Sequence, residues 1–393
     1  MSDAPTDVSS QPGDRARAHF DLIALRHNLG EIERRVGRET QIIASVKADA
    51  YGHGAVAVAR ALESADVFGL ATGSVKEAAQ IRHAQVATPI LLFPGYGADA
   101  VPEILRHRLT AGIDRIELAR ELSAQASAMV PVWLKVDAGL GRHGVPPYDV
   151  VGFAEAVSAL PRVELEGVFT HLPFVDRAGQ EWAEAGLARF ASVLQSLDER
   201  DLKPRHSQAL SSVGALAGLA DPSTAICPGH ALYGIQAAST EVISMDGLEQ
   251  VARSITTALA HVVCHPESRT IGVGGARTLA AGVITGVVPL GRRDGYRWAA
   301  EQSAAMLVHG QRAPVIGLSL EHATLDLTDI PSAHVGDDVV ALGGDGDAAI
   351  TLAELAAWRS STPVETLLDF AGRVERCYTG AQPGVDIADS SSS

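Results

Sequence analysis

The chain has 393 residues, of which 46% are apolar and 20% charged, which is typical of a globular protein with more than one ordinary domain. The formal net charge of −15 disfavours nucleic acid and anionic membranes as partners, because an acidic surface repels both. The three cysteines, Cys227, Cys264 and Cys377, are widely spaced and predict neither a disulfide framework nor a metal-binding pair. We therefore expect a cytoplasmic protein.

The two ends of the chain differ in composition from the rest. Residues 1–15 and 381–393 are polar and show no apolar periodicity, which predicts disordered tails. The N-terminal segment has no basic stretch followed by apolar residues, so we expect no signal peptide. No run of about 18 apolar residues predicts a membrane-spanning helix.

Residues 16–244 are predicted to form the larger domain. Short apolar runs alternate there with longer helical patterns, such as residues 54–65 and 185–197, and this rhythm indicates repeated β-then-α units. Eight such units predict a (β/α)8 TIM-like barrel, although alternation alone leaves a doubly wound open sheet as the competing fold. The predicted strands are residues 42–46, 67–71, 89–93, 110–113, 131–136, 165–172, 206–212 and a segment around 231–235.

The rhythm changes after residue 245. Residues 245–380 contain strand-like runs that are separated by Gly, Pro and Asp turns, with little helical pattern. Such a region is typical of a β domain. The predicted fold class is therefore α/β, with an N-terminal barrel followed by a smaller, mostly β C-terminal domain.

The most informative segment is IIASVKADAYGHG, residues 42–54. Lys47 lies at the carboxyl end of the first predicted barrel strand, which is the end that carries the active site in barrel enzymes. An ammonium group held against an apolar wall has a lowered pKa, and a neutral lysine amine can react with an aldehyde cofactor. The turn at residues 51–54 offers a hydroxyl and bare backbone near a helix start, which suits a phosphate. Taken alone, a lysine at a strand end is more often a surface residue.

Many motifs, in order along residues 18–378, resemble those of the alanine racemase family. They are VKADAYGHG (46–54), WLKVDAGLGRHG (133–144), FTHLP (169–173), SSVGAL (211–216), CPGHALYG (227–234), PLGRRDGYR (289–297), LSLEHATLDLTDIP (318–331) and GDDVVALGG (336–344). The resemblance implies pyridoxal 5'-phosphate (PLP) as the cofactor, held by Lys47, and an isomerase that acts on an amino acid. It also implies a homodimer in which each C-terminal domain completes the partner's active site.

The family pattern implies roles for the residues at matching positions. The matches to phosphate contacts are Tyr51, Ser212, Gly229, His230 and Tyr233. His171 matches a histidine that packs against the pyridine ring, although a histidine in such a position is otherwise more often a buried core residue. Arg142 matches an arginine that helps to bind the substrate carboxylate. Lys135 matches a lysine that is often carbamylated to support that arginine, and a structural ion pair is an equally good interpretation.

Two other kinds of site receive little support. Residues 139–144, GLGRHG, fit the dinucleotide-binding pattern, and Glu164 follows at a plausible distance, but a single match to this pattern is weak evidence. The 14 histidines show no metal-ligand spacing, so we predict no metal site.

Three departures from the family pattern stand out, the last of them a pair of residues. Arg292 stands where the family has the tyrosine that serves as the second catalytic base, and a guanidinium stays protonated and is a poor base. Cys227 stands where the family has an arginine beside the cofactor's ring nitrogen, and it would place a near-neutral group there. Leu320 and Glu321 replace a Met–Asp pair of the substrate-binding region, so we expect a reshaped pocket.

These departures leave more than one function open. We predict a racemase or epimerase with an altered amino-acid substrate, in which Tyr296, His230 or water supplies a proton on the face opposite Lys47, because racemisation by two bases needs a donor on each face. The alternative is a lyase or transferase, such as an aldolase, decarboxylase or transaminase, which needs only one base. A non-catalytic PLP-binding protein is a third possibility, which the carboxylate-binding Arg142 argues against.

Overall fold

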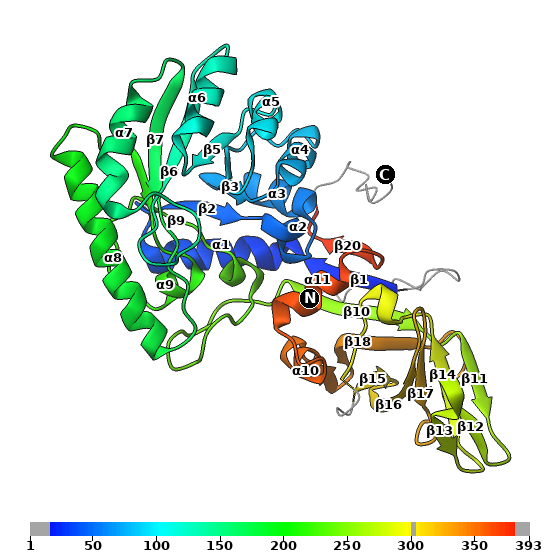
Figure 1. Cartoon of the computed structure of the whole chain (residues 1–393). Helices are drawn as coiled ribbons and strands as arrows, with labels where there is room; N and C mark the ends of the chain where they lie inside the picture. Colours follow the sequence, from blue (N-terminus) through cyan, green and yellow to red (C-terminus); the bar gives the residue numbers. More distant parts are fainter. Residues whose placement is uncertain (1–15, 300–303, 382–393) are drawn as a thin grey trace, which may run out of the picture. The chain divides into compact units, whose positions relative to one another are not determined.

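We describe residues 16–299 and 304–381 of a computed structural model of the chain (Figure 1). They divide into two compact units, one of Leu22–Val251 and one that joins the first strand to Ala252–Thr379. The predicted tails, apart from Ala381, lie outside the described residues. Among the described helices, none has the length and apolar character that a membrane crossing requires.

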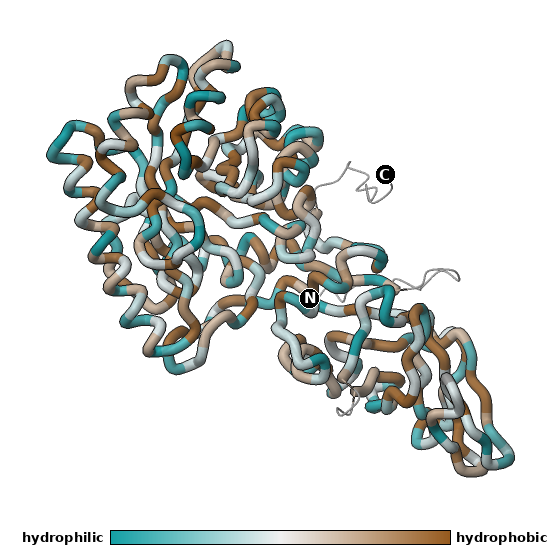
Figure 2. Tube along the Cα trace, viewed as in Figure 1, coloured by the Kyte–Doolittle hydropathy of each residue, from teal (hydrophilic) through white to brown (hydrophobic). Residues whose placement is uncertain are grey.

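The first unit contains a closed barrel of eight parallel strands (Figure 1). This confirms the predicted barrel and excludes the open sheet. Strands β3, β4 and β5 are buried along their whole length, which explains their mostly apolar sequences. Figure 2 colours the apolar residues of the chain brown. The strands are β2 Gln41–Ser45, β3 Gly69–Thr72, β4 Ile90–Leu92, β5 Thr110–Ile113, β6 Val130–Lys135, β7 Val163–Phe169, β8 His206–Gln208 and β9 Ala225–Ile226.

Helices connect these strands and cover the barrel, as the alternating pattern predicts. The longest, α8, buries a stripe that includes Leu187, Phe190 and Leu194 and leaves its other face exposed, which is the amphipathic pattern of a surface helix. The helices are α1 Leu22–Val36, α2 Lys47–Tyr51, α3 Ala55–Glu63, α4 Val75–His83, α5 Val101–Arg106, α6 Ile116–Gln125, α7 Val150–Ser158, α8 Arg177–Asp198 and α9 Ser212–Leu216, with short 3-10 helices η1 Ala98–Ala100, η2 Pro147–Asp149 and η3 His230–Tyr233.

The prediction of the last barrel strand was wrong. Strand β9, Ala225–Ile226, closes the barrel by pairing with β2, whereas the predicted segment around 231–235 forms η3. The apolar residues of η3 are buried because the Tyr233 hydroxyl donates a hydrogen bond to the Ser45 carbonyl, 2.9 Å away. A two-residue strand leaves too short an apolar run for a sequence pattern to detect.

The second unit is built mainly on one sheet, which confirms a mostly β C-terminal domain. The strand order is β11-β14-β17-β16-β15-β18-β10-β1-β20, with β19 paired to β18 and a separate β12–β13 hairpin. The strands are β1 Ala16–Asp21, β10 Ala252–Ala258, β11 His261–Cys264, β12 Arg269–Ile271, β13 Arg277–Leu279, β14 Ile284–Val288, β15 Ala305–Val308, β16 Gln311–Leu318, β17 Ala323–Asp326, β18 Asp338–Asp345, β19 Ala348–Ile350 and β20 Glu375–Thr379. Two helices, α10 Leu352–Trp358 and α11 Pro363–Phe370, and the 3-10 helices η4 Val273–Gly275 and η5 Arg292–Asp294 complete it.

The unit boundaries differ from the predicted domains 16–244 and 245–380. Strand β1 opens the described chain but pairs antiparallel with β10 and parallel with β20, so it belongs to the C-terminal sheet. Alternation along the chain cannot reveal this, because the partners of β1 lie far away in sequence. The barrel unit runs on to Val251.

The connection between β2 and α3 is a left-handed helical turn. Its four non-glycine residues, 48–51, have φ angles of 53° to 55°, a conformation that costs roughly 1–2 kcal/mol for each L-residue. The Asp49 amide donates to Glu77 Oε1 of α4 at 2.9 Å, and Asp49 Oδ1 accepts the Ala55 amide at 2.7 Å. Hydrogen bonds from two neighbouring helices therefore hold the turn in this conformation.

Replacing Ala48 with glycine is expected to stabilise the protein. Ala48 is exposed, so its methyl group contributes little packing, and glycine removes the steric cost of the left-handed conformation. We expect a gain of up to about 1 kcal/mol, measured as a higher midpoint of thermal unfolding. The same replacement at Ala185, exposed within α8, is the control and should cost about 1 kcal/mol. Destabilisation of similar size in both variants would show that the turn is not strained.

Candidate active site

The structure gathers the predicted site residues of the barrel unit at one rim. Lys47 follows β2, Lys135 ends β6, and His171 follows β7. Ser212 begins α9 after β8, and Cys227 directly follows β9. The carboxyl ends of parallel strands meet at one end of a barrel, so residues that are far apart in sequence share this rim.

A group of hydroxyls and backbone amides lies beside Lys47. Ser212 Oγ accepts hydrogen bonds from the amides of Gly229 at 2.9 Å and Ala231 at 3.1 Å. Tyr51 Oη lies 3.4 Å from Ser45 Oγ. A Cβ atom at position 229 would lie only 2.1 Å from Tyr51 Oη, so this close approach requires glycine. We call Tyr51, Ser212 and Gly229 the hydroxyl cradle.

Two aromatic side chains of η3 support the cradle. The Tyr51 ring lies 5.1 Å, between centroids, from each of the rings of His230 and Tyr233. Tyr233 is fully buried, and its hydroxyl donates a hydrogen bond to the Ser45 carbonyl. Tyr233 was predicted to contact the cofactor, but this geometry gives it the role of fixing η3 against the end of β2.

The environment of Lys47 favours its neutral amine. Burial lowers the pKa of Lys47, and the positive charge of Arg142 lowers it further. A thiolate at Cys227 would oppose this, but burial raises the pKa of that thiol to about 12, so the thiol stays neutral near pH 7. The Lys47 ammonium or amine nitrogen lies 5.7 Å from the centre of the Tyr51 ring, next to the cradle.

Two further basic side chains at the rim have lowered pKa values. Lys135 is 5% exposed, and its Nζ donates to the Val136 carbonyl at 2.9 Å. Burial lowers the pKa of Lys135 to about 8, which gives it the partly neutral amine that carbamylation would need. Burial, followed by the charges of Lys47 and Lys135, lowers the pKa of His171 to about 3. His171 is therefore a neutral, flat group at physiological pH.

Arg142 projects from a tight loop after β6. The Asp137 carboxylate closes this loop by accepting the amides of Gly139 and Gly141 at 3.1 and 3.0 Å. Gly144 closes its other end, where a Cβ would lie 2.6 Å from the Asp137 nitrogen. Among the described residues, no carboxylate or carbonyl pairs with the exposed Arg142 side chain. The geometry of this loop therefore explains the glycines, and no dinucleotide-binding role is needed to account for them.

The predicted residues of the C-terminal unit form a second group. In η5, the amide of Arg292 donates to the Ser319 carbonyl at 3.0 Å, and that of Arg293 donates to the Leu320 carbonyl at 2.7 Å. Leu320 is 70% exposed. Glu321 pairs with Arg373 at 3.1 Å. These contacts place Arg292, Leu320 and Glu321 on neighbouring segments.

The side chain of Arg292 has no partner within the part of the chain that the structure describes. Arg292 is exposed, and Asp294 instead accepts the Gly291 amide at 2.9 Å and lies 3.5 Å from Arg373. Tyr296, by contrast, is fully buried and donates to the Ala305 carbonyl at 3.4 Å. Tyr296 is therefore enclosed in the C-terminal unit and is unsuited to act as the second base, contrary to one of our predictions.

Comparisons with known proteins identify the family. Residues 20–237 match the model of the alanine racemase N-terminal domain, and residues 252–378 match that of the C-terminal domain. The chain belongs to the alanine racemase family. It is 32% identical over 369 residues to the alanine racemase of Desulforamulus reducens, across 92% of this chain and 98% of the relative. The alanine racemase of Sorangium cellulosum is 34% identical over 376 residues, across 92% and 98%. The crystal structure of alanine racemase from E. faecalis has a TM-score of 0.86 at 28% identity and covers 95% of this chain and 100% of its own.

Members of the alanine racemase family are PLP-dependent isomerases, and the rim offers the groups that PLP needs. A lysine amine with a lowered pKa suits the aldehyde, hydroxyls suit the phosphate, and the neutral His171 suits a flat ring face. The glycine at position 229 allows the Tyr51 hydroxyl to approach the backbone closely, which keeps the groups of the hydroxyl cradle together. The residues of this chain therefore fit the family's cofactor.

The sequence analysis missed the residues that shape this alanine racemase-like rim. Asp49 and Glu77 hold the left-handed turn, and Ser45 binds both Tyr51 and Tyr233. The segment 42–54 contains Ser45 and Asp49, but nothing in a one-dimensional pattern shows that Glu77 of α4 reaches the Asp49 amide.

The Lys47 amine is expected to become reactive at lower pH than an ordinary lysine. Because its pKa is lowered, chiefly by burial, a larger fraction is unprotonated at a given pH. The protein would first be dialysed against hydroxylamine and then reductively methylated across a pH series, with mass spectrometry to follow Lys47. The rate should reach half its maximum below the ordinary lysine pKa of about 10.4.

A charge variant tests the cause of this shift. Arg142→Gln removes a positive charge that lowers the pKa of Lys47, so the midpoint should move to higher pH. Arg120→Gln, at an exposed position of α6, should leave it in place. A native midpoint at or above about 10.4 would contradict the lowered pKa of Lys47.

Proposed function

We propose that this protein is a PLP-dependent amino-acid isomerase that uses Lys47 as its cofactor lysine and accepts a substrate with a second acidic group. The Lys47 amine, partly buried beside the hydroxyl cradle and with a lowered pKa, is the observation that supports the cofactor assignment. PLP, when bound, withdraws electrons from the substrate α-carbon and makes its proton acidic.

The proposed binding roles follow from the position and charge of each side chain. Tyr51 and Ser212, with the backbone at Gly229 and His230, would bind the phosphate through hydroxyl and amide hydrogens. His171, neutral because burial lowers its pKa to about 3, would lie against the ring.

Lys47 and Arg142 would act on the substrate itself. Arg142, with its exposed guanidinium, would bind the α-carboxylate as a planar fork. Lys135 would support that arginine if carbamylated. Lys47 Nζ would remove the α-proton on its own face, because an unprotonated amine is a competent base.

Cys227 would change the charge around the ring nitrogen. The buried Cys227 thiol is neutral because burial raises its pKa to about 12, so it supplies no fixed positive charge. Arginine at this position, as in the family pattern, would supply one. We expect weaker electron withdrawal by the ring than in a typical alanine racemase, since such neighbours tune a cofactor's chemistry.

Arg292 supports a substrate other than alanine. The guanidinium stays protonated and presents paired donors that match a carboxylate. It is exposed and lacks an acidic partner among the described residues. We therefore propose that Arg292 binds the second acidic group of the substrate and does not serve as a base.

The proton donor for the opposite face would then be His230 or water. Tyr296 is excluded by its burial. His230 lies against Tyr51, and burial, with a further effect of the Lys47 charge, lowers its pKa to about 4. It is thus a neutral imidazole near pH 7 and a poor proton donor, which favours water for this role.

Because arginine is a poor base, its presence at position 292 also favours a second candidate function. A lyase or transferase needs a base on only one face, which Lys47 alone supplies. The two candidates differ in what happens to the configuration of the α-carbon, so one assay separates them.

The Lys47→Ala variant is expected to lose both the cofactor band and turnover. The native protein should show the visible absorption of a lysine-held aldehyde cofactor and lose it on borohydride reduction, because Lys47 holds the aldehyde. Lys76→Ala, at an exposed lysine of α4, is the matched control and should keep both. Full activity of Lys47→Ala would remove this residue from the mechanism.

Incubation of a panel of neutral and acidic amino acids in deuterated water distinguishes isomerisation from one-base chemistry. An isomerase should incorporate deuterium at the α-carbon with loss of optical purity. Incorporation with retained configuration would contradict the isomerase and indicate the one-base alternative. Racemisation of alanine at the rate of a typical family member would contradict the altered substrate.

Replacement of Arg292 tests the acidic substrate. Arg292→Ala should lose roughly 2 kcal/mol of transition-state binding, measured by kcat/KM, for acidic substrates and much less for neutral ones. Arg293→Ala removes a neighbouring exposed arginine and is the control. Equal losses for neutral and acidic substrates would contradict the proposed charge pairing. Arg292→Tyr should gain alanine racemisation if this position alone redirects the substrate.

We also propose a homodimer, because in the family pattern Arg292, Leu320 and Glu321 of one subunit complete the site of the other. Light scattering together with activity measured over a dilution series tests this arrangement. Full activity of a monomer would contradict it.

A further inference from the structure

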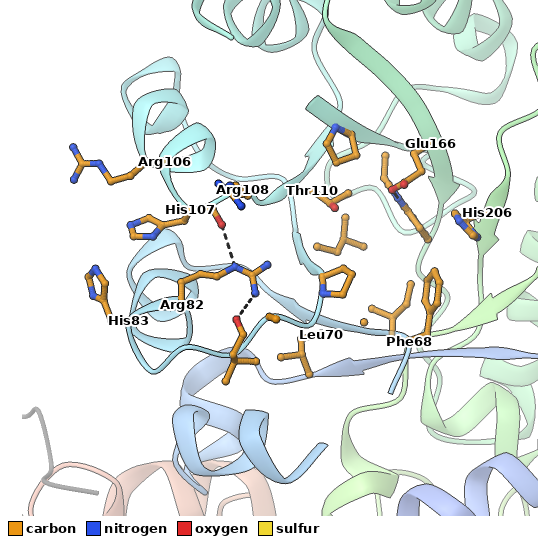
Figure 3. A pocket seen from close by; sticks show the side chains of 18 residues that line it. Phe68, Leu70, Arg82, His83, Arg106, His107, Arg108, Thr110, Glu166 and His206 are labelled. Carbon is orange, nitrogen blue, oxygen red and sulfur yellow. Dashed lines mark hydrogen bonds between the residues drawn. The ribbon is translucent and has the colours of Figure 1, made fainter. Parts of the chain in front are cut away.

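The barrel has a cavity at the end opposite Lys47, whose lining side chains are drawn in Figure 3. Its volume of about 670 Å³ lies within the range of small-molecule sites. Its lining includes residues at the amino ends of the strands: Gly69 of β3, Pro89 before β4, Thr110 of β5, Pro131 of β6 and His206 of β8. In most barrels of this type, this end contributes to stability and the interior is packed.

One wall of the cavity is aromatic and firmly held. The rings of Trp133 and His206 stack with centroids 5.8 Å apart and planes 9° apart, and Phe68 lies 5.1 Å from His206. Trp133 Nε1 donates to Glu166 Oε2 at 3.1 Å, and His206 Nδ1 lies 2.9 Å from Gln41 Oε1. These bonds hold the aromatic side chains in place, and because Trp133 is only 3% exposed, the partly buried Phe68 offers the aromatic surface that a ligand can reach.

The opposite wall is basic (Figure 3). The guanidinium of Arg82 is already hydrogen-bonded within the protein, because it donates to the carbonyls of His107, Val86 and Thr88 at 3.0, 2.7 and 2.7 Å. Arg106 pairs with Glu103 at 3.1 Å. These two arginines are therefore structural or already neutralised.

Arg108 differs from its neighbours. It is exposed, lines the cavity, and has no ion pair or side-chain hydrogen bond among the described residues. Its φ angle of +49° places it in the left-handed region, which non-glycine residues adopt infrequently. The wall thus presents a positive charge that no neighbouring acid satisfies.

We propose that this cavity binds a planar aromatic carboxylate. The ring would lie against the partly buried Phe68, since flat aromatic groups gain from offset or edge contacts with such a side chain. The carboxylate would pair with the guanidinium of Arg108. Glu166, at the aromatic wall, repels a second acidic group, so the ligand has its charge at one end only.

The cavity is separate from the rim but packed against the same core. Ile43, Leu91 and Trp133 line it and belong to one buried apolar cluster with Phe169 and Cys227. The proposal does not depend on the function assigned to Lys47, because binding here is measured without turnover.

Calorimetric titration of the purified holoenzyme with 2-naphthoate and the neutral 2-naphthalenemethanol tests the site. 2-Naphthoate should bind saturably, with one site per chain and about tenfold more tightly than the alcohol, because only the anion pairs with Arg108. Arg108→Asn should abolish this preference, and asparagine tolerates the left-handed backbone. Arg120→Asn, at an exposed position of α6, should keep it. Absence of saturable binding, or a preference unchanged in Arg108→Asn, would overturn the proposal.

A blocking variant shows where the probe binds. Ala87 is exposed and lines the cavity, so Ala87→Trp should close the mouth and remove binding of both probes. Ala185→Trp, exposed on α8, should change neither affinity. Full binding in a folded Ala87→Trp variant would place the probe elsewhere, for instance at Arg142, and would refute this site.

Discussion

The left-handed turn at residues 48–51 is the constraint on which the rim depends. It reverses the chain directly after β2, so Lys47 stays at the rim while Tyr51 Oη comes within 3.4 Å of Ser45 Oγ. This position of Tyr51 leaves no space for a side chain at Gly229, whose amide can then reach Ser212. An unfavourable backbone conformation is tolerated when its surroundings over-determine it. Here it brings an amine and the hydroxyl cradle together.

Burial sets the charge state of the rim as much as residue type does. It lowers the pKa values of Lys47, Lys135 and His171 and raises that of Cys227, so each of these groups is moved toward its neutral form. Arg142 lies exposed on the glycine-rich loop beside them. A guanidinium next to amines of lowered pKa is suited to bind an anion, and a lowered pKa makes it easier for an amine to lose its proton and act as a base.

The sequence predicted the structural features that depend on residues close together in the chain. It missed the features that depend on contacts between residues far apart in the chain. Seven barrel strands follow from runs of buried apolar residues, and Lys47 follows from its place after the first of them. The pairing of β1 with β10 and β20, and the closure by the short β9, are long-range events. In the same way, Tyr233 and Tyr296 carry hydroxyls that look reactive in sequence, but each is buried and bonded to a backbone carbonyl. Residue type gives the chemistry available, and only tertiary contacts show whether it is used.

The surroundings of Arg292 are compatible with the proposed anion-binding role of its side chain. Gly291 and Asp294 close η5, and the acids that could neutralise the arginine, Asp294 and Glu321, face Arg373. The contacts within this segment therefore leave the Arg292 guanidinium without an acidic partner among the described residues. Exchange of a tyrosine for arginine at such a position removes a proton donor and adds an anion-binding fork in one step. In the function that we propose, loss of the second base and binding of an acidic substrate would both follow from this one side chain.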